Sequence, residues 1–268
     1  MSGYKPQLDS LRAFAVLVVL IGHFAGVPSA IQGVQLFFVL SGFLITSILL
    51  DCKSQIEGQD ASRGFLLREF YIRRFLRIFP PYYALLMGLV LIQLTSGTRT
   101  SWGPATSFWQ SLGFHATYTS NVWFAFTGRW DPWATSHFWS LAIEEQFYLF
   151  WPLIVLWVPR RSLWLAATLL IALGPVSRWL MLAHGANKIA FGTLTPAYFD
   201  FLGLGAFLAI VGAQPRAQFV LRLFGITAGA VLAIGASFAM NFKGTDVFLW
   251  ALAFTGLVSK ASEGLTGP

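Results

Sequence analysis

The sequence of 268 residues is 56% hydrophobic and only 11% charged, whereas roughly a quarter of the residues in a soluble domain are charged. So few polar side chains cannot cover a water-facing surface, which excludes a soluble globular protein. The net charge of +7 does not indicate nucleic-acid binding, because the basic residues adjoin apolar runs and form no polar basic domain.

The apolar runs predict an all-α, polytopic transmembrane bundle, because a spanning helix needs about 20 mostly apolar residues. We expect eight spans, and no soluble domain interrupts them, so residues 1–268 form a single transmembrane domain. The predicted spans cover residues 8–27, 34–50, 79–95, 138–158, 162–182, 197–213, 217–240 and 246–259. The aromatic but interrupted stretch 107–126 is expected to be an interfacial or re-entrant segment.

The distribution of lysine and arginine predicts a cytoplasmic N-terminus. In that orientation thirteen of the 18 lysines and arginines fall in cytoplasmic segments and five fall outside. Short cytoplasmic loops retain such residues, so this bias supports the orientation. A single cysteine, Cys52, excludes an intrachain disulfide and a cysteine metal cluster, and no histidine spacing suggests metal ligands. We therefore expect no bound metal.

The first predicted span, LDSLRAFAVLVVLIGHF, carries two ionisable residues, Arg12 and His23. They are 11 residues apart, close to three helical turns, and so share one face with a separation of roughly 16 Å along the axis. Ionisable residues within a membrane are functional candidates, and histidine exchanges a proton near neutral pH as a general base must. The alternatives are a histidine hydrogen-bonded for packing alone and an arginine that extends to the membrane surface.

Residues 65–83, FLLREFYIRRFLRIFPPYY, predict an amphipathic interfacial helix that leads into a span beginning at Pro80. A helix would gather Arg73, Arg74 and Arg77 on neighbouring turns, and Glu69 lies four residues before Arg73. Three guanidinium groups at the cytoplasmic surface are a candidate phosphate clamp, because arginine offers bidentate donors. The alternative is retention of positive charge beside lipid headgroups.

Residues 136–153, SHFWSLAIEEQFYLFWPL, place two adjacent carboxylates in an apolar helix. Ser140, Glu144 and Tyr148 follow at four-residue spacing and share a face, whereas Glu145 points about 100° away. A carboxylate in this setting needs a partner or a polar cavity. Glu144 is a candidate to orient an imidazole or an acceptor hydroxyl, and a structural ion pair with an arginine is the alternative.

Two further segments carry polar or small residues within apolar runs. Ser41 and Gly42, in GVQLFFVLSGFLIT, are expected to allow close helix packing, since no base adjoins the serine. Asp200, in TPAYFDFLGLGAFLA, is a further carboxylate near the entrance of a span, and its role is open.

Four of these segments, in the same order along the chain, resemble acyltransferase family 3, a family of bacterial multi-spanning enzymes that O-acylate glycans and related acceptors. The segments are LDSLRAFAVLVVLIGHF, GVQLFFVLSGFLIT, YIRRFLRIFPPYY and WSLAIEEQFYLFWPL, and the resemblance covers residues 7–153 strongly and 195–209 weakly. Members usually have two more spans than the eight expected here. The resemblance therefore implies that the family's last two spans are absent from these 268 residues.

The resemblance also implies roles for particular residues. His23 and Arg12 match the family's catalytic histidine motif, and Asp9 matches an aspartate that precedes the arginine. Arg73, Arg74 and Arg77 match an arginine motif associated with acyl-CoA, and Glu144 matches the carboxylate of the WSL-to-FY block. We place Ser140, Tyr148 and Asp200 as supporting residues.

The implied function is transfer of an acyl group, expected to be acetyl, from cytoplasmic acyl-CoA to a hydroxyl of a cell-surface or exported glycan, which can be lipid-linked, at the bacterial cytoplasmic (inner) membrane. No permanently bound cofactor is expected, and the partners are acyl-CoA, the glycan and membrane lipids, not nucleic acid. A proton-coupled transporter that uses His23, Glu144 and Asp200 is one alternative. An inactive membrane partner is another.

Overall fold

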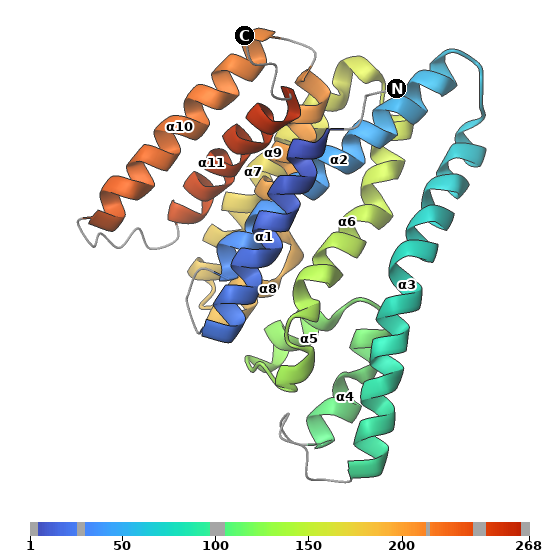
Figure 1. The fold of residues 1–268 in the computed structure, drawn as a ribbon, viewed down its shortest axis with the longest axis vertical. Helices are drawn as coiled ribbons and strands as arrows, with labels where there is room; N and C mark the ends of the chain where they lie inside the picture. The colour runs from blue at the N-terminus through green and yellow to red at the C-terminus, as the bar shows by residue number, and fades with distance from the viewer. Residues whose placement is uncertain (1–4, 26–29, 97–104, 213–214, 238–244, 264–268) are drawn as a thin grey trace. The chain divides into compact units, whose positions relative to one another are not determined.

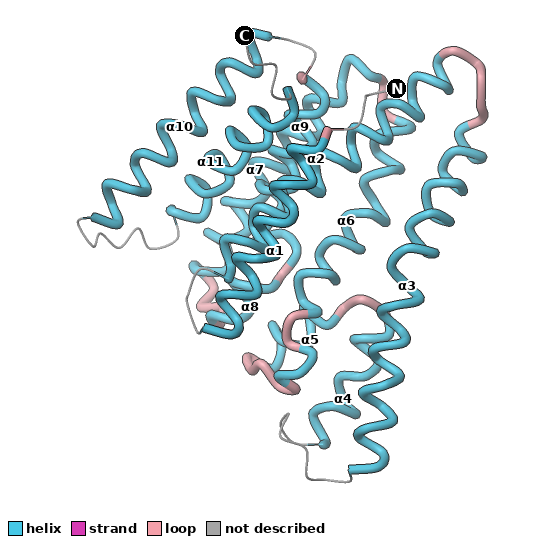
Figure 2. The backbone as a smooth tube through the Cα atoms, in the orientation of Figure 1, coloured by secondary structure: helices cyan, strands magenta, loops and turns pink. Residues whose placement is uncertain are grey.

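The computed structural model describes residues 5–25, 30–96, 105–212, 215–237 and 245–263. Within these ranges every regular element is a helix, and short loops join the helices (Figures 1 and 2). The α-helices are α1 (Pro6–Ala25), α2 (Ala30–Glu57), α3 (Arg63–Ser96), α4 (Ala105–Ala116), α5 (Ser120–Thr127), α6 (Phe138–Trp157), α7 (Leu163–Ala183), α8 (Lys188–Thr193), α9 (Phe199–Val211), α10 (Pro215–Ser237) and α11 (Thr245–Glu263). Three short 3-10 turns are η1 (Trp133–Thr135), η2 (Arg160–Ser162) and η3 (Thr195–Tyr198). The prediction of an all-α bundle is confirmed.

Each of the eight predicted spans falls mainly on one helix, and these helices are α1, α2, α3, α6, α7, α9, α10 and α11, of which α9 has only 13 residues. The ends of the first, sixth and seventh predicted spans, 26–27, 213 and 238–240, lie outside the described residues. Four segments of the described chain are long and apolar enough to cross a membrane: Pro6–Ala25, Ile31–Glu57, Arg63–Thr95 and Arg160–Ala183. The count of eight spans and the cytoplasmic N-terminus stay predictions.

The amphipathic segment at the start of α3 differs from its predicted form, whereas the interfacial or re-entrant character of residues 107–126 stays a prediction. The amphipathic stretch and the following span form one continuous helix, α3, which contains Pro80 and Pro81. Two prolines remove two backbone donors, yet the helix continues through them, so the predicted boundary at Pro80 is wrong. The stretch 107–126 forms two short helices, α4 and α5, separated at Tyr118, whose φ of 53° places it in the left-handed region.

The chain divides into two compact units. The first unit comprises residues 1–51, 157–177 and 198–268, and the second comprises residues 52–156 and 178–197. In the first unit, α9 is buried along most of its length and packs against α10 and α11, and α1 packs against α11. In the second unit, α3 packs against α4, α4 against α5, and α5 against α8.

Glycines set the helix crossings of the first unit. A Cβ atom added to Gly42 of α2 would lie 2.1 Å from the backbone oxygen of Leu202 in α9. A Cβ atom on Gly205 of α9 would lie equally close to the backbone oxygen of Val39 in α2. The two backbones therefore meet at a distance that only glycine permits, and the prediction that Gly42 allows close packing is confirmed.

Hydrogen bonds between buried side chains hold the second unit together. Gln146 of α6 donates from Nε2 to the backbone oxygen of Tyr118 at 2.9 Å and to Oδ1 of Asn121 at 3.0 Å. Asn121 in turn donates from Nδ2 to Oγ1 of Thr195 at 2.9 Å, and the Thr195 hydroxyl also bonds Gln146. This network joins α5, α6 and η3.

His115 is a second buried polar group of this unit. Its Nε2 lies 2.8 Å from Oγ1 of Thr135, and its backbone oxygen accepts a 2.8 Å hydrogen bond from the Tyr82 hydroxyl. Burial, with a smaller contribution from His137, lowers the pKa of His115 to about 4. The imidazole is therefore neutral at physiological pH. Beside it, the ring of Tyr82 stacks on that of Tyr118 with centroids 4.4 Å apart.

Candidate functional site

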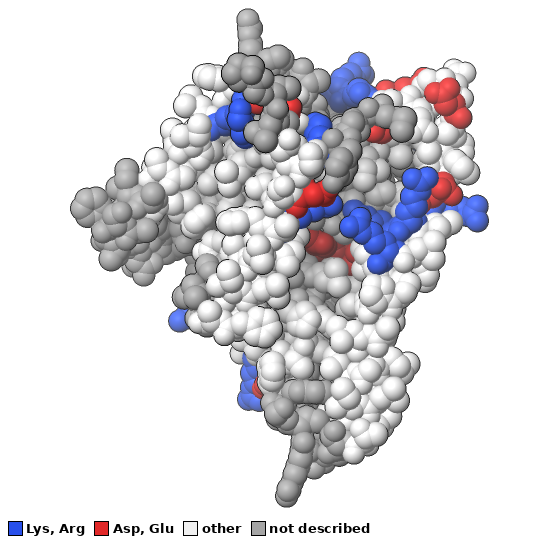
Figure 3. All heavy atoms as spheres, in the orientation of Figure 1, with Lys and Arg blue, Asp and Glu red and all other residues white. Residues whose placement is uncertain are grey.

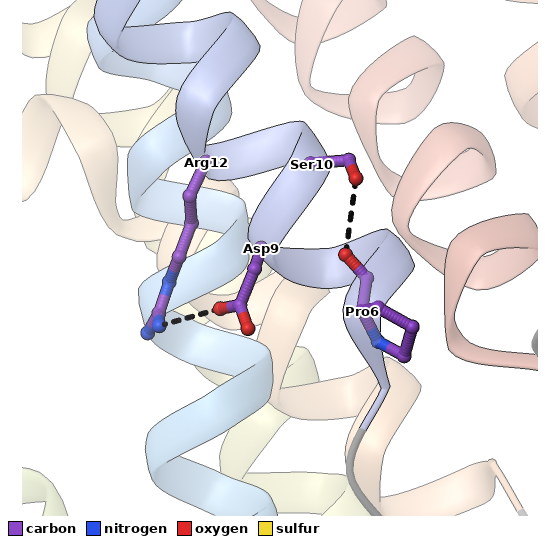
Figure 4. Close-up of polar contacts among 4 residues, drawn as sticks. All are labelled: Pro6, Asp9, Ser10 and Arg12. Atoms are coloured by element: carbon purple, nitrogen blue, oxygen red, sulfur yellow. Dashed lines mark hydrogen bonds and ion pairs between the residues drawn. The ribbon is translucent and has the colours of Figure 1, made fainter.

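The first turns of α1 place Arg12 beside Asp9. Nη1 of Arg12 lies 3.5 Å from Oδ1 of Asp9, and both side chains are partly exposed (Figure 4). Ser10, the neighbour of Asp9, turns instead to the backbone and donates to the oxygen of Pro6 at 3.1 Å. Asp9 and Arg12, which both match the family's opening motif, thus form an ion pair one helical turn apart.

His23 lies in the last turn of α1 and is exposed within the structure. Its Nδ1 is 2.8 Å from the backbone oxygen of Val19. A carbonyl oxygen only accepts hydrogen bonds, so Nδ1 is the donor in this contact. Nε2 is therefore the ring nitrogen that is left to act as a general base.

The arginine cluster lies in the first half of α3, where basic side chains gather on the surface (Figure 3). Arg73 is 80% exposed and pairs with Glu69, one helical turn earlier, at 3.2 Å. Arg77 is also exposed. Arg74 differs, because its guanidinium carbon lies 4.3 Å from the centre of the Tyr148 ring in α6. One of the three arginines therefore turns inward and two face outward.

Beside Arg74, helices α3 and α6 line a half-open pocket of about 170 Å³. Aromatic and aliphatic side chains form most of its wall, and Arg74 and Glu145 supply its charges. The lining residues are Tyr71, Arg74, Phe75, Phe79, Glu145, Tyr148 and Leu149. The Tyr71 hydroxyl donates to the backbone oxygen of Leu149 at 2.7 Å and so joins the two helices at the pocket.

The two carboxylates of α6 have different surroundings. Glu144 accepts a hydrogen bond from the Tyr148 hydroxyl at 3.3 Å, which agrees with their predicted shared face. Glu145 lines the pocket and interacts electrostatically with Glu144 and Arg74. Its Oε1 is buried and has no hydrogen-bond partner among the described residues. Ser140 donates to the backbone oxygen of His137 at 3.2 Å.

Asp200 is fully buried in the first unit, in the first turn of α9. Its Oδ1 accepts a hydrogen bond from the backbone N–H of Phe201 at 3.2 Å. A Cβ atom on Gly174 of α7 would lie 2.7 Å from the Asp200 carboxyl carbon, so a glycine makes room for this carboxylate. The structure therefore places Asp200 at a helix packing site.

The predicted site residues fall in both units. Asp9, Arg12, His23 and Asp200 belong to the first, whereas the three arginines, Ser140, Glu144 and Tyr148 belong to the second. Within the second unit the structure brings Arg74 and Tyr148 together. It adds Tyr71 and Glu145, neither of which was predicted. Tyr71 lies three residues before Arg74, so helical spacing alone would have placed it on the same face.

Comparison with known proteins decides the family. A model of the acyltransferase domain matches residues 5–264, nearly the whole chain. The chain belongs to acyltransferase family 3. Together with the four helices of membrane-crossing length in the described part of the chain, this membership identifies a multi-pass membrane protein.

Individual relatives are similar over much of the chain. Peptidoglycan O-acetyltransferase OatA of Listeria monocytogenes is 34% identical over 96% of this chain and 40% of the relative. YrhL of Bacillus subtilis, provisionally named a peptidoglycan O-acetyltransferase, is 36% identical over 80% of this chain and 34% of the relative. The chain thus spans less than half the length of these relatives. No solved structure matches it.

Proposed function

We propose that this chain transfers an acetyl group from cytoplasmic acetyl-CoA to a hydroxyl of a cell-wall glycan, at the bacterial inner membrane. The observation that carries the proposal is the similarity to a peptidoglycan O-acetyltransferase over 96% of the chain. Acetyl is the group named for that relative, and peptidoglycan supplies the expected acceptor class.

His23 is the proposed general base. Its Nδ1 contact with the Val19 oxygen leaves Nε2 able to accept the proton of the acceptor hydroxyl. The hydroxyl oxygen attacks the thioester carbonyl, the carbon–sulfur bond breaks, and the departing thiolate takes up the proton from the imidazolium. The products are an O-acetyl ester and CoA, and the histidine returns to its starting state.

Other charged groups of the chain have supporting roles in the proposal. Asp9 holds Arg12 through the 3.5 Å ion pair and so fixes a positive charge on the same helix as the base. Arg73 and Arg77, both exposed on α3, bind the donor phosphates, for which guanidinium groups offer paired donors. Glu144 orients the Tyr148 hydroxyl through their hydrogen bond.

Replacement of the histidine tests the proposal. Purified in detergent and supplied with acetyl-CoA and a peptidoglycan fragment, His23→Ala is expected to lose acetyl transfer by about 10²–10⁴-fold, the usual contribution of a general base. His184→Ala, which removes an exposed histidine just after α7, is the matched control and should transfer acetyl at the normal rate. Normal transfer by His23→Ala would remove this residue from the mechanism.

A further inference from the structure

The pocket between α3 and α6 has a composition unsuited to a phosphate. Glu145 lines it, and Glu144 lies within electrostatic range of Glu145. The guanidinium of Arg74 already lies over the Tyr148 ring and beside Glu145, so its charge is partly balanced. A phosphate group would meet a carboxylate here, whereas Arg73 and Arg77 on the outer face offer more exposed positive charge.

The pocket is also too small for a whole nucleotide cofactor. Its volume of about 170 Å³ lies below the roughly 300–1,000 Å³ of sites that enclose a drug-sized ligand. The walls include the rings of Tyr71, Phe75, Phe79 and Tyr148. Flat aromatic groups pack favourably against such rings and against a guanidinium plane. The pocket therefore suits one uncharged, planar portion of a larger ligand.

Glu145 adds a specific requirement for that portion. Its buried Oε1 has no hydrogen-bond partner in the described part of the chain, and a buried acceptor without a partner is unfavourable. A ligand group with an N–H directed at this oxygen would satisfy it. An aromatic base held between apolar side chains, with an exocyclic amine at a polar group, follows the general pattern by which proteins bind an unstacked nucleobase.

We propose that this pocket binds the adenine base of the acyl-CoA donor, with the adenine amino group donating to Oε1 of Glu145. This inference rests on the proposed use of acyl-CoA. The proposal gives one stretch of α3 two functions, binding of the phosphates and binding of the base. The phosphates lie on the outward arginines, Arg73 and Arg77, and the base enters beside the inward arginine, Arg74. Tyr148 holds that guanidinium in place as one wall of the pocket.

Equilibrium binding to the detergent-solubilised chain tests the proposal without requiring turnover. The probes are CoA, the CoA analogue in which hypoxanthine replaces adenine, and pantetheine, which lacks the nucleotide. The analogue is close to CoA in size, but it carries an oxygen acceptor in place of the amino donor. We expect CoA to bind about 10- to 100-fold more tightly than the analogue, as for loss of a hydrogen bond to a charged group.

Two variants of Glu145 identify the group responsible. Glu145→Leu removes the acceptor at similar volume and should bind CoA and the hypoxanthine analogue equally. Glu145→Gln keeps an acceptor oxygen without the charge and should retain part of the discrimination. Pantetheine affinity should be unchanged in both variants, which separates a contact to the base from a general distortion of the site.

Several results would overturn the assignment. Equal affinity of the unaltered chain for CoA and the analogue excludes an adenine contact at Glu145. An equal loss of pantetheine and CoA affinity in Glu145→Leu assigns the pocket to the pantetheine arm. Discrimination against the analogue in a chain that transfers no acetyl group to any glycan would support the pocket and contradict the proposed function, so the two failures are distinguishable.

Discussion

The two units of this protein are stabilised in contrasting ways. In the first unit, helices approach closely where side chains are absent, as at Gly42 and Gly205. In the second, side chains of Gln146, Asn121 and Thr195 hydrogen-bond across helices. The surroundings of the proposed functional groups also differ. His23 contacts a backbone oxygen of its own helix, whereas the guanidinium of Arg74 contacts an aromatic ring of another helix. A single substitution should therefore act through packing in one unit and through polar contacts in the other.

The largest effect on stability is expected at the glycine crossing. Gly42→Ala places a Cβ atom 2.1 Å from the backbone oxygen of Leu202, and relief of the clash requires movement of a helix backbone. We expect a loss of roughly 3 kcal/mol, the upper part of the usual range for overpacking. Gly88→Ala in α3 is the control, because apart from its chain neighbours and its own helix backbone no atom lies within 4 Å of its added Cβ. Thermal unfolding in detergent measures both, and equal melting temperatures would contradict the close approach of α2 and α9.

The sequence was sufficient to predict the long apolar helices and a close helix approach at Gly42, because both follow from local composition. It did not identify α9 as the partner helix. The four-residue spacing also predicted that Glu144 and Tyr148 share a face. It did not predict Glu145, because adjacent residues on a helix point about 100° apart and the neighbouring helix decides which one meets a pocket. The inward turn of Arg74 was unpredictable for the same reason, since Tyr148 lies on another helix. Two prolines in α3 suggested a boundary, yet the helix continues through both of them.

The next effect is a pH dependence confined to the second unit. The pKa of His115 is about 4 in the folded unit and about 6.5 when the chain is unfolded. Between these values the unfolded state binds more protons, so stability is complete above about pH 6.5 and falls as the pH decreases toward 4. The loss is at most about 3 kcal/mol. Unfolding of α4 and α5, followed by hydrogen exchange at several pH values, measures it.

A variant without the buried imidazole isolates this contribution. His115→Gln retains a polar group near Thr135 but does not titrate, so the slope of stability against pH should flatten between pH 4 and 6.5. His137, which is exposed and contributes to the low pKa of His115, is unchanged in that variant. Any slope that persists can therefore include the titration of His137 but not that of His115. An unchanged slope would mean that other groups of the unit cause the pH dependence.

The smallest effects distinguish arginines that are adjacent in sequence. Arg74→Ala removes the guanidinium over the Tyr148 ring, and we expect a loss of about 1 kcal/mol, typical of a partly buried cation–π contact. Arg73→Ala removes a pair with Glu69 in which the arginine is 80% exposed, and it should cost under about 0.5 kcal/mol. Thermal unfolding of the two single variants gives this ranking.

Ligand binding should reverse that order of importance. If Arg73 and Arg77 contact the donor phosphates, replacing both with alanine should weaken CoA binding. The affinity should also depend less on salt, because the arginine–phosphate attractions that salt screens are absent from the variant. Arg74→Ala should leave the salt dependence intact, since its guanidinium faces an aromatic ring and a carboxylate in the pocket. A salt dependence that disappears only in Arg74→Ala would place the phosphates at the inward arginine. It would also assign the outward pair to the membrane surface, where exposed arginines contact lipid headgroups.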